Sequence, residues 1–293
     1  MAEAVVLRRE RARRARLLWR RLTKDRLSLA AGGAIVAIML AALAAPWLAP
    51  YDPDATSASD ALQRVSLRHW MGTDVYGRDL LSRVIHAARV DLLVALTATA
   101  VALTWGAFLG AVAGYRGGWM DQLVMRLVDT IMAFPAFILT MGITATLGNS
   151  TLNVVVAIAI THVPIYARLL RGEMLKAREM EYAEAARTVG NRPARIVFFH
   201  LLPNCVPPLI VQATLAMGFA ILTVAALSFI GLGIQPPQSE WGYMTAEGAG
   251  YIVSGEWWLF LFPGVAIMVT VLAFNLIGDA LRDVLDPRMR GVR

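Results

Sequence analysis

Three acidic residues, Asp91, Asp129 and Asp279, lie in or beside long apolar stretches of the chain. Carboxylates in such surroundings are costly and often carry protons or ions. Each of the three, however, falls near the end of its stretch, where water or an arginine can reach it. Asp129 with Arg126 and Asp279 with Arg282 have i,i+3 spacing, so we interpret them as local ion pairs rather than as a proton relay.

No other side chains form a pattern that supports catalysis. The chain has no G-x-x-x-x-G-K-[ST] phosphate loop, no HExxH pair and no Ser/His/Asp set, and Lys24 and Lys176 follow no glycine-rich turn. The histidines lack metal-ligand spacing, and for His162, inside an apolar stretch, we expect a structural hydrogen bond. The single cysteine, Cys205, excludes an internal disulfide. We therefore predict a protein that is not an enzyme and binds no cofactor or metal.

A charged insert interrupts the apolar stretches at residues 181–204, EYAEAARTVGNRPARIVFFHLLPN. Its first part is rich in helix formers, and Gly190 stands where a helix commonly ends in left-handed geometry. We expect Asn191 and Pro193 to begin a second short helix, which Pro203 ends before the next apolar stretch.

The first helix of this insert offers a docking surface. Ala185, Ala186 and Gly190 are small enough for another protein to approach the backbone, and Glu184 could pair with an arginine of that partner. The alternative is an ordinary amphipathic surface helix with an internal Glu184–Arg187 pair. Taken alone, the residues favour this alternative.

The composition indicates what positions the insert. The chain of 293 residues is 57% hydrophobic and only 17% charged, whereas soluble domains have about 25% charged residues. The apolar residues form blocks of the roughly 20 residues that cross a membrane, where single segments must be helical. We predict an all-α integral membrane protein with six spans, the third and fourth interrupted at Pro135 and Pro164: 28–49, 90–114, 127–147, 152–170, 206–230 and 258–280.

The basic residues orient these spans. Both ends of the chain and the charged insert fall on one side, which is rich in Lys and Arg and is therefore cytoplasmic. The opposite side holds only five of the 28 basic residues: Arg64, Arg68, Arg78, Arg83 and Arg89. The predicted topology has both termini inside.

We expect three parts in the chain. Residues 1–26 form a basic cytoplasmic tail beside anionic lipid; nucleic-acid binding is the alternative, but Trp19 is its only aromatic residue. A cleaved signal peptide is excluded by the length of the next apolar run. Residues 27–89 add the first span and an external segment ending in an amphipathic surface helix. Residues 90–293 form the core domain, whose external loop carries membrane-interface aromatic residues: Trp241, Tyr243, Tyr251, Trp257 and Trp258.

The insert resembles the EAA loop of the permease subunits of bacterial ABC importers. That pattern is E-A-A, three residues, G, nine residues, then I-x-L-P. The residues that match at this spacing are Glu184, Ala185, Ala186, Gly190, Leu202 and Pro203. His200 replaces the isoleucine, as in the peptide-type branch. The resemblance implies that this loop, about 171–203, couples the permease to an ATPase, with Glu181 and Arg187 among the contacts.

Three further stretches resemble the dipeptide/oligopeptide/nickel branch of these permeases, and its C-type subunit in particular. Two of them are ALSFIGLGIQPPQSEWGYM and FPGVAIMVTVLAFNLIGDALRDVLDPRMR. The third contains GTDVYGRD, and the resemblance makes it an external structural motif with the residues Gly72, Thr73, Asp74, Gly77, Arg78 and Asp79.

The resemblance implies a type I ABC importer permease fold in the bacterial cytoplasmic (inner) membrane. It implies as partners a homologous B-type permease, two cytoplasmic ATPase subunits or domains that bind ATP and Mg²⁺, an external solute-binding protein and a peptide. Nickel chelates and glutathione-like molecules are alternative substrates, and an ion-coupled stand-alone carrier or a non-transporting scaffold are alternative functions. Side chains of the fifth span that could line a pathway or join helices are Gln212, Thr214, Thr223 and Ser228.

Overall fold

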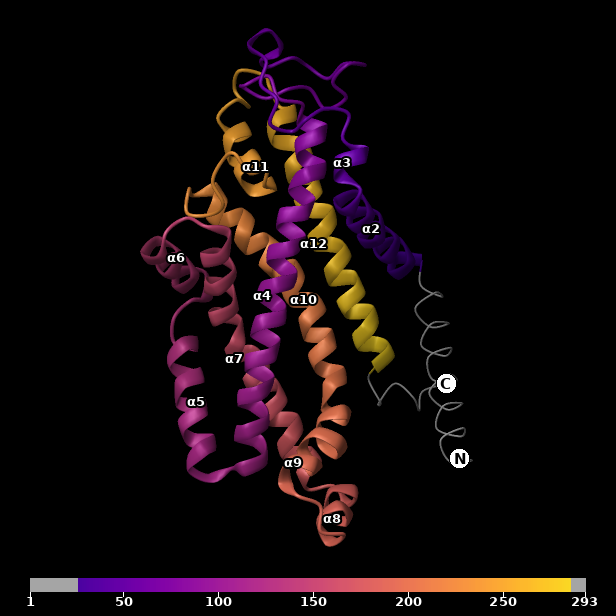
Figure 1. The fold of residues 1–293 in the computed structure, drawn as a ribbon, viewed down its shortest axis with the longest axis vertical. Helices are drawn as coiled ribbons and strands as arrows, with labels where there is room; N and C mark the ends of the chain where they lie inside the picture. Colours follow the sequence, from indigo (N-terminus) through magenta and orange to yellow (C-terminus); the bar gives the residue numbers. More distant parts are fainter. Residues whose placement is uncertain (1–25, 286–293) are drawn as a thin grey trace.

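The computed structural model describes residues 26–285, so nearly all of the predicted N-terminal tail lies outside the described residues. Within them the regular structure is helical apart from an isolated bridge between Thr73 and Asp79. The elements are α2 (Arg26–Leu43), α3 (Ala45–Leu48), η1 (Ala58–Asp60), α4 (Leu80–Arg116), α5 (Gly118–Met132), α6 (Ala136–Leu147), α7 (Thr151–Arg178), α8 (Glu181–Thr188), α9 (Pro193–Arg195), η2 (Ile196–Leu201), α10 (Leu202–Phe229), α11 (Trp241–Ala249) and α12 (Trp258–Leu285). Figure 1 shows a bundle with α8 at one end and α11 at the other.

The bundle confirms the predicted all-α membrane fold. Helices α2, α4, α7 and α12, together with the continuous α9–η2–α10 segment, are long and apolar enough to cross a membrane. The third predicted span is instead a pair of helices, α5 and α6, which meet at 85°. Pro135 ends the helical hydrogen bonding there, because it has no N–H and disfavours helical geometry in the residue before it. At Pro164, by contrast, α7 continues without a break.

The predicted amphipathic surface helix before the second span does not exist as a separate element. Helix α4 runs unbroken from Leu80 to Arg116. Its 37 residues reach about 55 Å, well beyond a hydrocarbon core of about 30 Å. Its first turns are buried by other parts of the protein rather than by lipid; Leu80 and Ala88 belong to an internal apolar cluster. The apolar spacing of these residues predicts a helix with one buried face, but it does not predict that other parts of the protein bury that face.

Helices α4 and α7 pack unusually closely through a row of glycines. Gly106, Gly110 and Gly114 follow one another at four-residue intervals on α4 and face the backbone of α7. A Cβ at residue 106 would lie 2.5 Å from the Tyr166 Cβ, and one at residue 114 would lie 2.7 Å from the Met174 Cβ. This small-xxx-small spacing is a known membrane packing signal, and it could have predicted the pairing of these two spans.

Replacing Gly110 with valine is expected to force α4 and α7 apart. A Cβ at residue 110 would clash with the Ala167 carbonyl oxygen and lie 3.0 Å from the Arg171 nitrogen. Overpacking of this kind costs about 1–3 kcal/mol, so the melting temperature of the detergent-solubilised protein should fall. Gly172→Ala on α7 is the matched control, because a Cβ there meets no atom within 4 Å. An unchanged melting temperature for Gly110→Val would contradict this packing.

The fifth span begins earlier than predicted. Pro203 does not end a helix; it lies at the start of α10, directly after the π-helical η2. Helical geometry therefore runs from Pro193 through the π-helical η2 to Phe229. Leu202 is partly buried against the core, whereas Pro203 is exposed.

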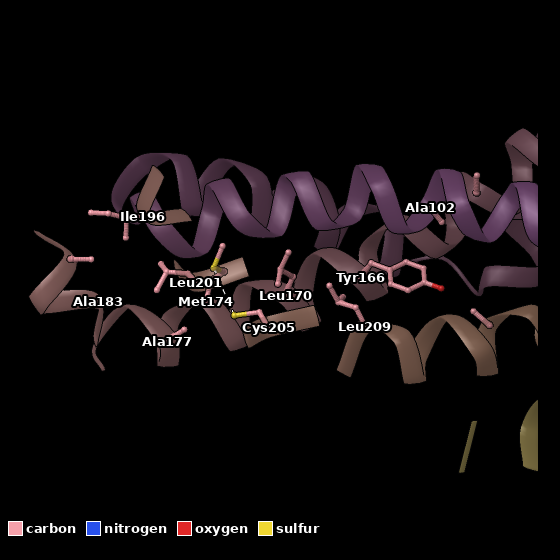
Figure 2. Packing of buried hydrophobic residues seen from close by; sticks show 13 residues of the cluster. Ala102, Tyr166, Leu170, Met174, Ala177, Ala183, Ile196, Leu201, Cys205 and Leu209 are labelled. Carbon is pink, nitrogen blue, oxygen red and sulfur yellow. Dashed lines mark hydrogen bonds between the residues drawn. The ribbon is translucent and has the colours of Figure 1, made fainter. Parts of the chain in front are cut away.

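The bundle has an apolar cluster at each end. At the α8 end, Figure 2 shows side chains of α7, α8, η2 and α10 meeting beneath α4. At the other end, Trp241 and Trp258 are each only 2% exposed, and their indole N–H groups donate to the carbonyl oxygens of Val84 (3.0 Å) and Thr73 (3.2 Å). The prediction that these two tryptophans form a membrane-interface belt is therefore wrong. Trp257, which is exposed, remains compatible with it.

Candidate functional site

The charged insert folds into a short helix that ends in a Schellman motif. Helix α8 is followed by Gly190 with a φ of 80°, a left-handed geometry that favours glycine. The Gly190 nitrogen donates to the Arg187 carbonyl (2.8 Å), and the Asn191 nitrogen donates to the Ala186 carbonyl (3.2 Å). The predicted end of this helix at Gly190 is confirmed.

The start of the next helix differs from the prediction. The Asn191 side chain donates to the Ala186 carbonyl (3.1 Å), so it closes α8 instead of capping α9. Arg192 is the residue before α9, and Pro193 takes the first helical position, as predicted. The Schellman turn places Asn191 one residue too early to cap the following helix.

Helix α8 lies on the bundle through two alanines. Ala183 and Ala186 are buried in the same apolar cluster as Ile196 and Leu201 (Figure 2). The prediction that Ala186 lies open to a partner is therefore wrong, because its i,i+3 spacing from Ala183 places both on the inner face. The predicted contact residues that α8 does expose are Glu181, Glu184, Ala185 and Arg187.

Two arginines tie α8 to the long helices. Arg187 forms no pair with Glu184; its Nη2 donates to the Arg178 carbonyl (2.8 Å) at the end of α7. Arg178 in turn donates from Nη1 to the Gly114 carbonyl (3.2 Å) near the end of α4. The internal ion pair of the surface-helix alternative is thus replaced by contacts that link α8 to α7 and α7 to α4.

At the opposite end, the GTDVYGRD motif forms a compact turn around Asp74. Its carboxylate accepts hydrogen bonds from the backbone nitrogens of Tyr76 (2.9 Å) and Arg78 (3.0 Å) and from the Arg78 Nε (2.6 Å). It also pairs with Nη1 of Arg83. All three charged side chains are buried, so one carboxylate pairs with two guanidinium groups away from water.

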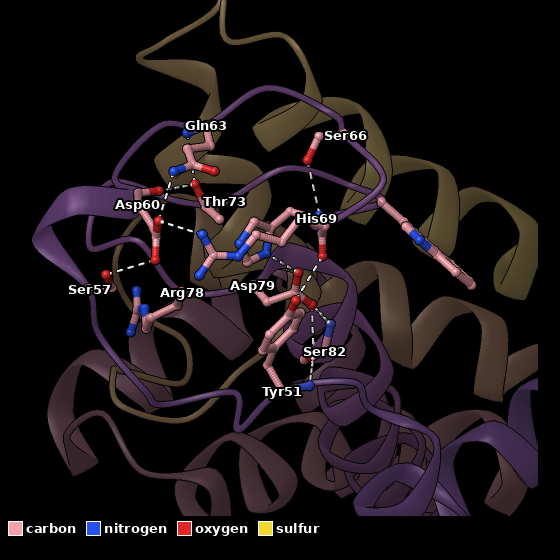
Figure 3. A network of polar contacts seen from close by, with 12 residues as sticks. Tyr51, Ser57, Asp60, Gln63, Ser66, His69, Thr73, Arg78, Asp79 and Ser82 are labelled. Atoms are coloured by element: carbon pink, nitrogen blue, oxygen red, sulfur yellow. Dashed lines mark hydrogen bonds and ion pairs between the residues drawn. The ribbon is translucent and has the colours of Figure 1, made fainter.

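The last residue of the motif, Asp79, caps helix α4. Its Oδ2 accepts from the Ser82 nitrogen (2.8 Å) and hydroxyl (2.7 Å), and its Oδ1 lies 2.9 Å from Nδ1 of His69 (Figure 3). An aspartate directly before a helix satisfies N–H groups that the helix itself leaves unpaired. Asp79 therefore fixes where α4 begins.

The two glycines of the motif allow close contacts. Gly77 has a φ of 74°, and a Cβ there would clash with the Ser57 carbonyl. A Cβ at Gly72 would lie 2.8 Å from the Trp258 ring. Both glycines thus let the motif pack against other external segments.

Thr73 holds the preceding turn on the motif. Its hydroxyl accepts from the Gln63 nitrogen (2.8 Å) and donates to the Asp60 carbonyl (Figure 3). Ser57 donates to the Asp60 carboxylate (2.8 Å), and this hydrogen bond lowers the pKa of Asp60. These hydrogen bonds join the motif to the turn that precedes it.

Sequence reasoning missed Arg83, the charged residue at the centre of this external network. Arg83 is fully buried, and besides Asp74 it contacts the Ser239 hydroxyl through Nε (3.3 Å). It also lies near Glu247 of α11, where it opposes the rise in pKa that burial causes for that carboxyl. The signal was its place on the buried face of α4, four residues after the Asp79 cap.

The expected ion pairs of the membrane acids do not form. Asp129 pairs with Arg168 of α7 (2.7 Å) rather than with Arg126, which is closer in sequence. Within the described residues, no ion pair joins Asp279 to Arg282, and both are exposed. Contacts between helices, which i,i+3 spacing cannot reveal, decide these partners.

The third membrane acid, Asp91, is placed differently from the prediction. It is 1% exposed, so neither water nor an arginine reaches it. Its carboxylate accepts a hydrogen bond from the Trp241 nitrogen (3.1 Å) and faces the carboxyl group of Glu240. Both contacts come from the start of α11: Trp241 is its first residue and Glu240 is its N-cap.

Three of the four polar side chains named for the fifth span form hydrogen bonds to the backbone of this chain. Thr214 and Thr223 donate to carbonyls one turn earlier (3.0 and 2.8 Å), and Ser228 accepts from the Ile234 nitrogen (3.2 Å). Gln212 is partly buried. These contacts assign none of the four side chains to a transport pathway.

The histidines and the cysteine have ordinary surroundings. Within residues 26–285, no three His, Cys, Asp or Glu side chains lie together in a way that could hold a metal ion. His162 Nδ1 lies 2.8 Å from the Ile158 carbonyl, the structural hydrogen bond expected for it. Cys205 is buried against Met174.

Comparison with known proteins identifies the family. Residues 106–291 match the family described as binding-protein-dependent transport system inner membrane component. Residues 14–64 match the N-terminal transmembrane domain of oligopeptide transport permease C. The chain belongs to this permease family. The predicted recognition as a C-type permease of the dipeptide/oligopeptide branch and the multi-pass location in the inner membrane are confirmed.

Individual relatives cover nearly the whole permease. The dipeptide transport system permease protein DppC of Alkalihalophilus pseudofirmus is 45% identical over 93% of this chain and 89% of its own length. The di/tripeptide transport system permease protein DppC of Pseudomonas aeruginosa is 44% identical over 86% and 85%. The glutathione transport system permease protein GsiD of Pectobacterium atrosepticum is 40% identical over 94% and 91%. Peptide permeases are thus similar to this permease over its full core.

Proposed function

We propose that this permease is the C-type membrane subunit of an ATP-binding-cassette importer that moves dipeptides and oligopeptides into the cell. The observation that carries the proposal is the position of α8. This exposed helix sits at the end of the bundle between two long spans, α7 and α10, and packs on them through its alanines (Figure 1). A force applied to α8 from the cytoplasm would therefore act on both spans.

In this proposal an ATPase subunit or domain binds α8 through its exposed face, and a second one binds the partner permease. Glu181, Glu184, Ala185 and Arg187 supply the contacts on this chain. ATP and Mg²⁺ are bound by the ATPases, and this chain catalyses no reaction. The permease has two conformations, and the closed ATPase pair binds one of them more tightly. Closure of the ATPase pair therefore shifts the permease toward that conformation.

The homologous B-type permease is proposed to pack on the face formed by α10 and α12. Two open apolar grooves of about 460 and 520 Å³ lie there. Exposed apolar side chains around them are Phe137, Leu222, Phe229 and Met268. Apolar surface on a membrane protein is covered by lipid or by another helix. The open grooves on this face can accommodate helices of a partner. The peptide would then pass between the two permeases after delivery by an external solute-binding protein.

The proposed substrate follows the relatives, most of which carry peptide transport in their names. The glutathione permease relatives favour an alternative of similar chemistry, a peptide-like thiol compound, and nickel chelates are a further alternative. Competition between a labelled dipeptide, glutathione and a nickel chelate for uptake by the reconstituted complex separates the three.

Reconstitution tests the whole proposal against an ion-coupled carrier and a scaffold. Proteoliposomes would contain this chain, its partner permease, the ATPases and the binding protein, with one component omitted at a time. Peptide uptake should require every component and internal ATP. Uptake that persists without the ATPases but requires an ion gradient would establish the carrier, and uptake that persists without this chain would establish the scaffold.

Replacing Gly190 with tryptophan is expected to block ATPase docking. A Cβ at residue 190 meets no atom of this chain within 4 Å, so the indole would project outward from α8. Gly190→Ala is the control, because it imposes the same strain at a φ of 80° without the bulk. Co-purification of the ATPase should be lost with Trp and retained with Ala; retention in both would argue against docking at this turn.

A further inference from the structure

Residues 239–241, at the start of α11, lie against α4 and are called the clip below. The Ser239 hydroxyl contacts Arg83 (3.3 Å), the Trp241 indole donates to the Val84 carbonyl, and the Trp241 nitrogen donates to Asp91 (3.1 Å). Arg83, Val84 and Asp91 span about two turns of one helix. The clip therefore fixes both the position and the direction of α11.

Glu240, in the middle of this clip, is held as an acceptor. Its two carboxylate oxygens accept from the backbone nitrogens of Gly242 and Tyr243, each at 2.7 Å. The Ser228 hydroxyl is a third donor to the same group. Burial raises the pKa of Glu240, and these donors oppose that rise because they favour the ionised form.

Asp91 meets Glu240 with a different set of partners. Its Oδ2 accepts from the Trp241 nitrogen, and its carboxyl group faces that of Glu240. Both groups are buried, at 1% and 0% exposed. Two carboxylates in contact away from water cannot both be ionised, so the pair must hold one proton.

The other charged groups near the clip do not neutralise this pair. On α4, Arg83 is engaged by Asp74 of the external motif and by Ser239. On α11, Glu247 interacts with Arg83, Asp74 and Arg78. From α10, the uncharged Ser228 faces the pair. A proton, rather than an arginine, therefore balances the second carboxyl group.

We propose that Asp91 carries this shared proton and donates it to the Glu240 carboxylate, and that this bond positions α11 for transport. Glu240, which already has three other donors, is the acceptor. Gly242 and Thr245 of α11 line one of the two grooves on the α10–α12 face, so a shift of α11 would change the groove's wall. Asp91 is thus a positioning residue of the proposed importer, and this role rests on the proposed function.

The shared proton makes the stability of the clip depend on pH. In the unfolded chain both carboxyl groups are ionised at neutral pH, whereas the folded pair retains one proton. The folded state therefore binds more protons, and the clip is weakened as the pH rises. Loss of the proton would leave two adjacent negative charges, which would push α11 away from α4.

Two isosteric variants in the reconstituted complex test the assignment. Asp91→Asn keeps the oxygen that accepts from Trp241 and can still donate to Glu240, so its uptake at pH 7 should stay within about twofold of wild type. Its uptake should also fall less with rising pH than that of wild type, because the amide at residue 91 does not titrate. Glu240→Gln loses the charged cap and should reduce uptake about fivefold at every pH. An alkaline fall in Asp91→Asn equal to that of wild type would overturn the proposal.

Infrared spectroscopy gives a readout that does not depend on transport. The wild-type complex should show the C=O stretching band of a protonated carboxylic acid at pH 7. This band should shift when aspartate, but not glutamate, carries a ¹³C-labelled carboxyl group, and it should vanish in Asp91→Asn. A band that follows the glutamate label would place the proton on Glu240 and contradict the assignment. Because this result is independent of substrate, failure of the proposed peptide specificity would leave it unchanged.

Discussion

Glu184→Lys is expected to reduce ATP-driven peptide uptake at least about 10-fold without unfolding the permease. Glu184 is exposed on the outer face of α8, whereas Ala183 and Ala186 hold the helix on the bundle from the other face. Reversing a charge that faces a complementary partner costs several kcal/mol, because attraction becomes repulsion. Since the Glu184 side chain is exposed, the cost should appear in ATPase binding and not in folding.

Three measurements on the reconstituted complex check this result. Uptake, ATP hydrolysis and melting temperature should be followed for Glu184→Lys and for Asp283→Lys. The latter makes the same charge reversal at an exposed position on the same predicted side, at the end of α12. We expect loss of uptake only for Glu184→Lys, with both melting temperatures unchanged. Normal coupled uptake by Glu184→Lys would refute the proposed role of α8.

Asp74→Ala is expected to destabilise the external end of the permease severely. Asp74 is the carboxylate partner of both Arg78 and Arg83, and all three side chains are almost fully buried. Removing one partner of a buried ion pair costs about 3–5 kcal/mol, because the remaining charge is left without compensation. Two guanidinium groups would lose their partner at once, so the yield and melting temperature of the detergent-solubilised protein should both fall sharply.

An exposed ion pair of the same segment supplies the control. The Arg68 side chain is 65% exposed and lies 3.5 Å from Asp60, so Arg68→Ala should leave the melting temperature almost unchanged. Adding Arg83→Met to Asp74→Ala should restore part of the stability, because it removes one of the unpaired charges. If Asp74→Ala and Arg68→Ala have equal effects, the buried network is not what holds this end together.

The features of the charged insert that the sequence predicts correctly depend on nearby residues. Helix formers followed by Gly190 are enough to predict where α8 ends, because the Schellman hydrogen bonds join residues at most five apart. The same local reasoning failed at Pro203. A proline is equally compatible with the end of one helix and with the first turn of another, and only the packing of α10 decides between them.

The membrane spans show the same division. Their helical type and approximate positions follow from blocks of apolar residues, since lipid permits no other single-segment structure. The break at Pro135 was also predicted, but its 85° angle was not. The angle between α5 and α6 depends on the neighbouring helices against which each of them packs.

The sequence by itself determined the class of the protein, its spans and the positions of its charged insert and GTDVYGRD motif, because apolar length, helix termini and motif spacing are all local along the chain. Only the tertiary structure decided which charges meet. Asp129 pairs with Arg168, and Arg83 contacts Ser239 from more than 150 residues away. Asp91 faces Glu240 because α11 folds back over α4. Partners in a buried network are selected by helix packing, which places distant residues within hydrogen-bond reach and leaves no trace in their spacing.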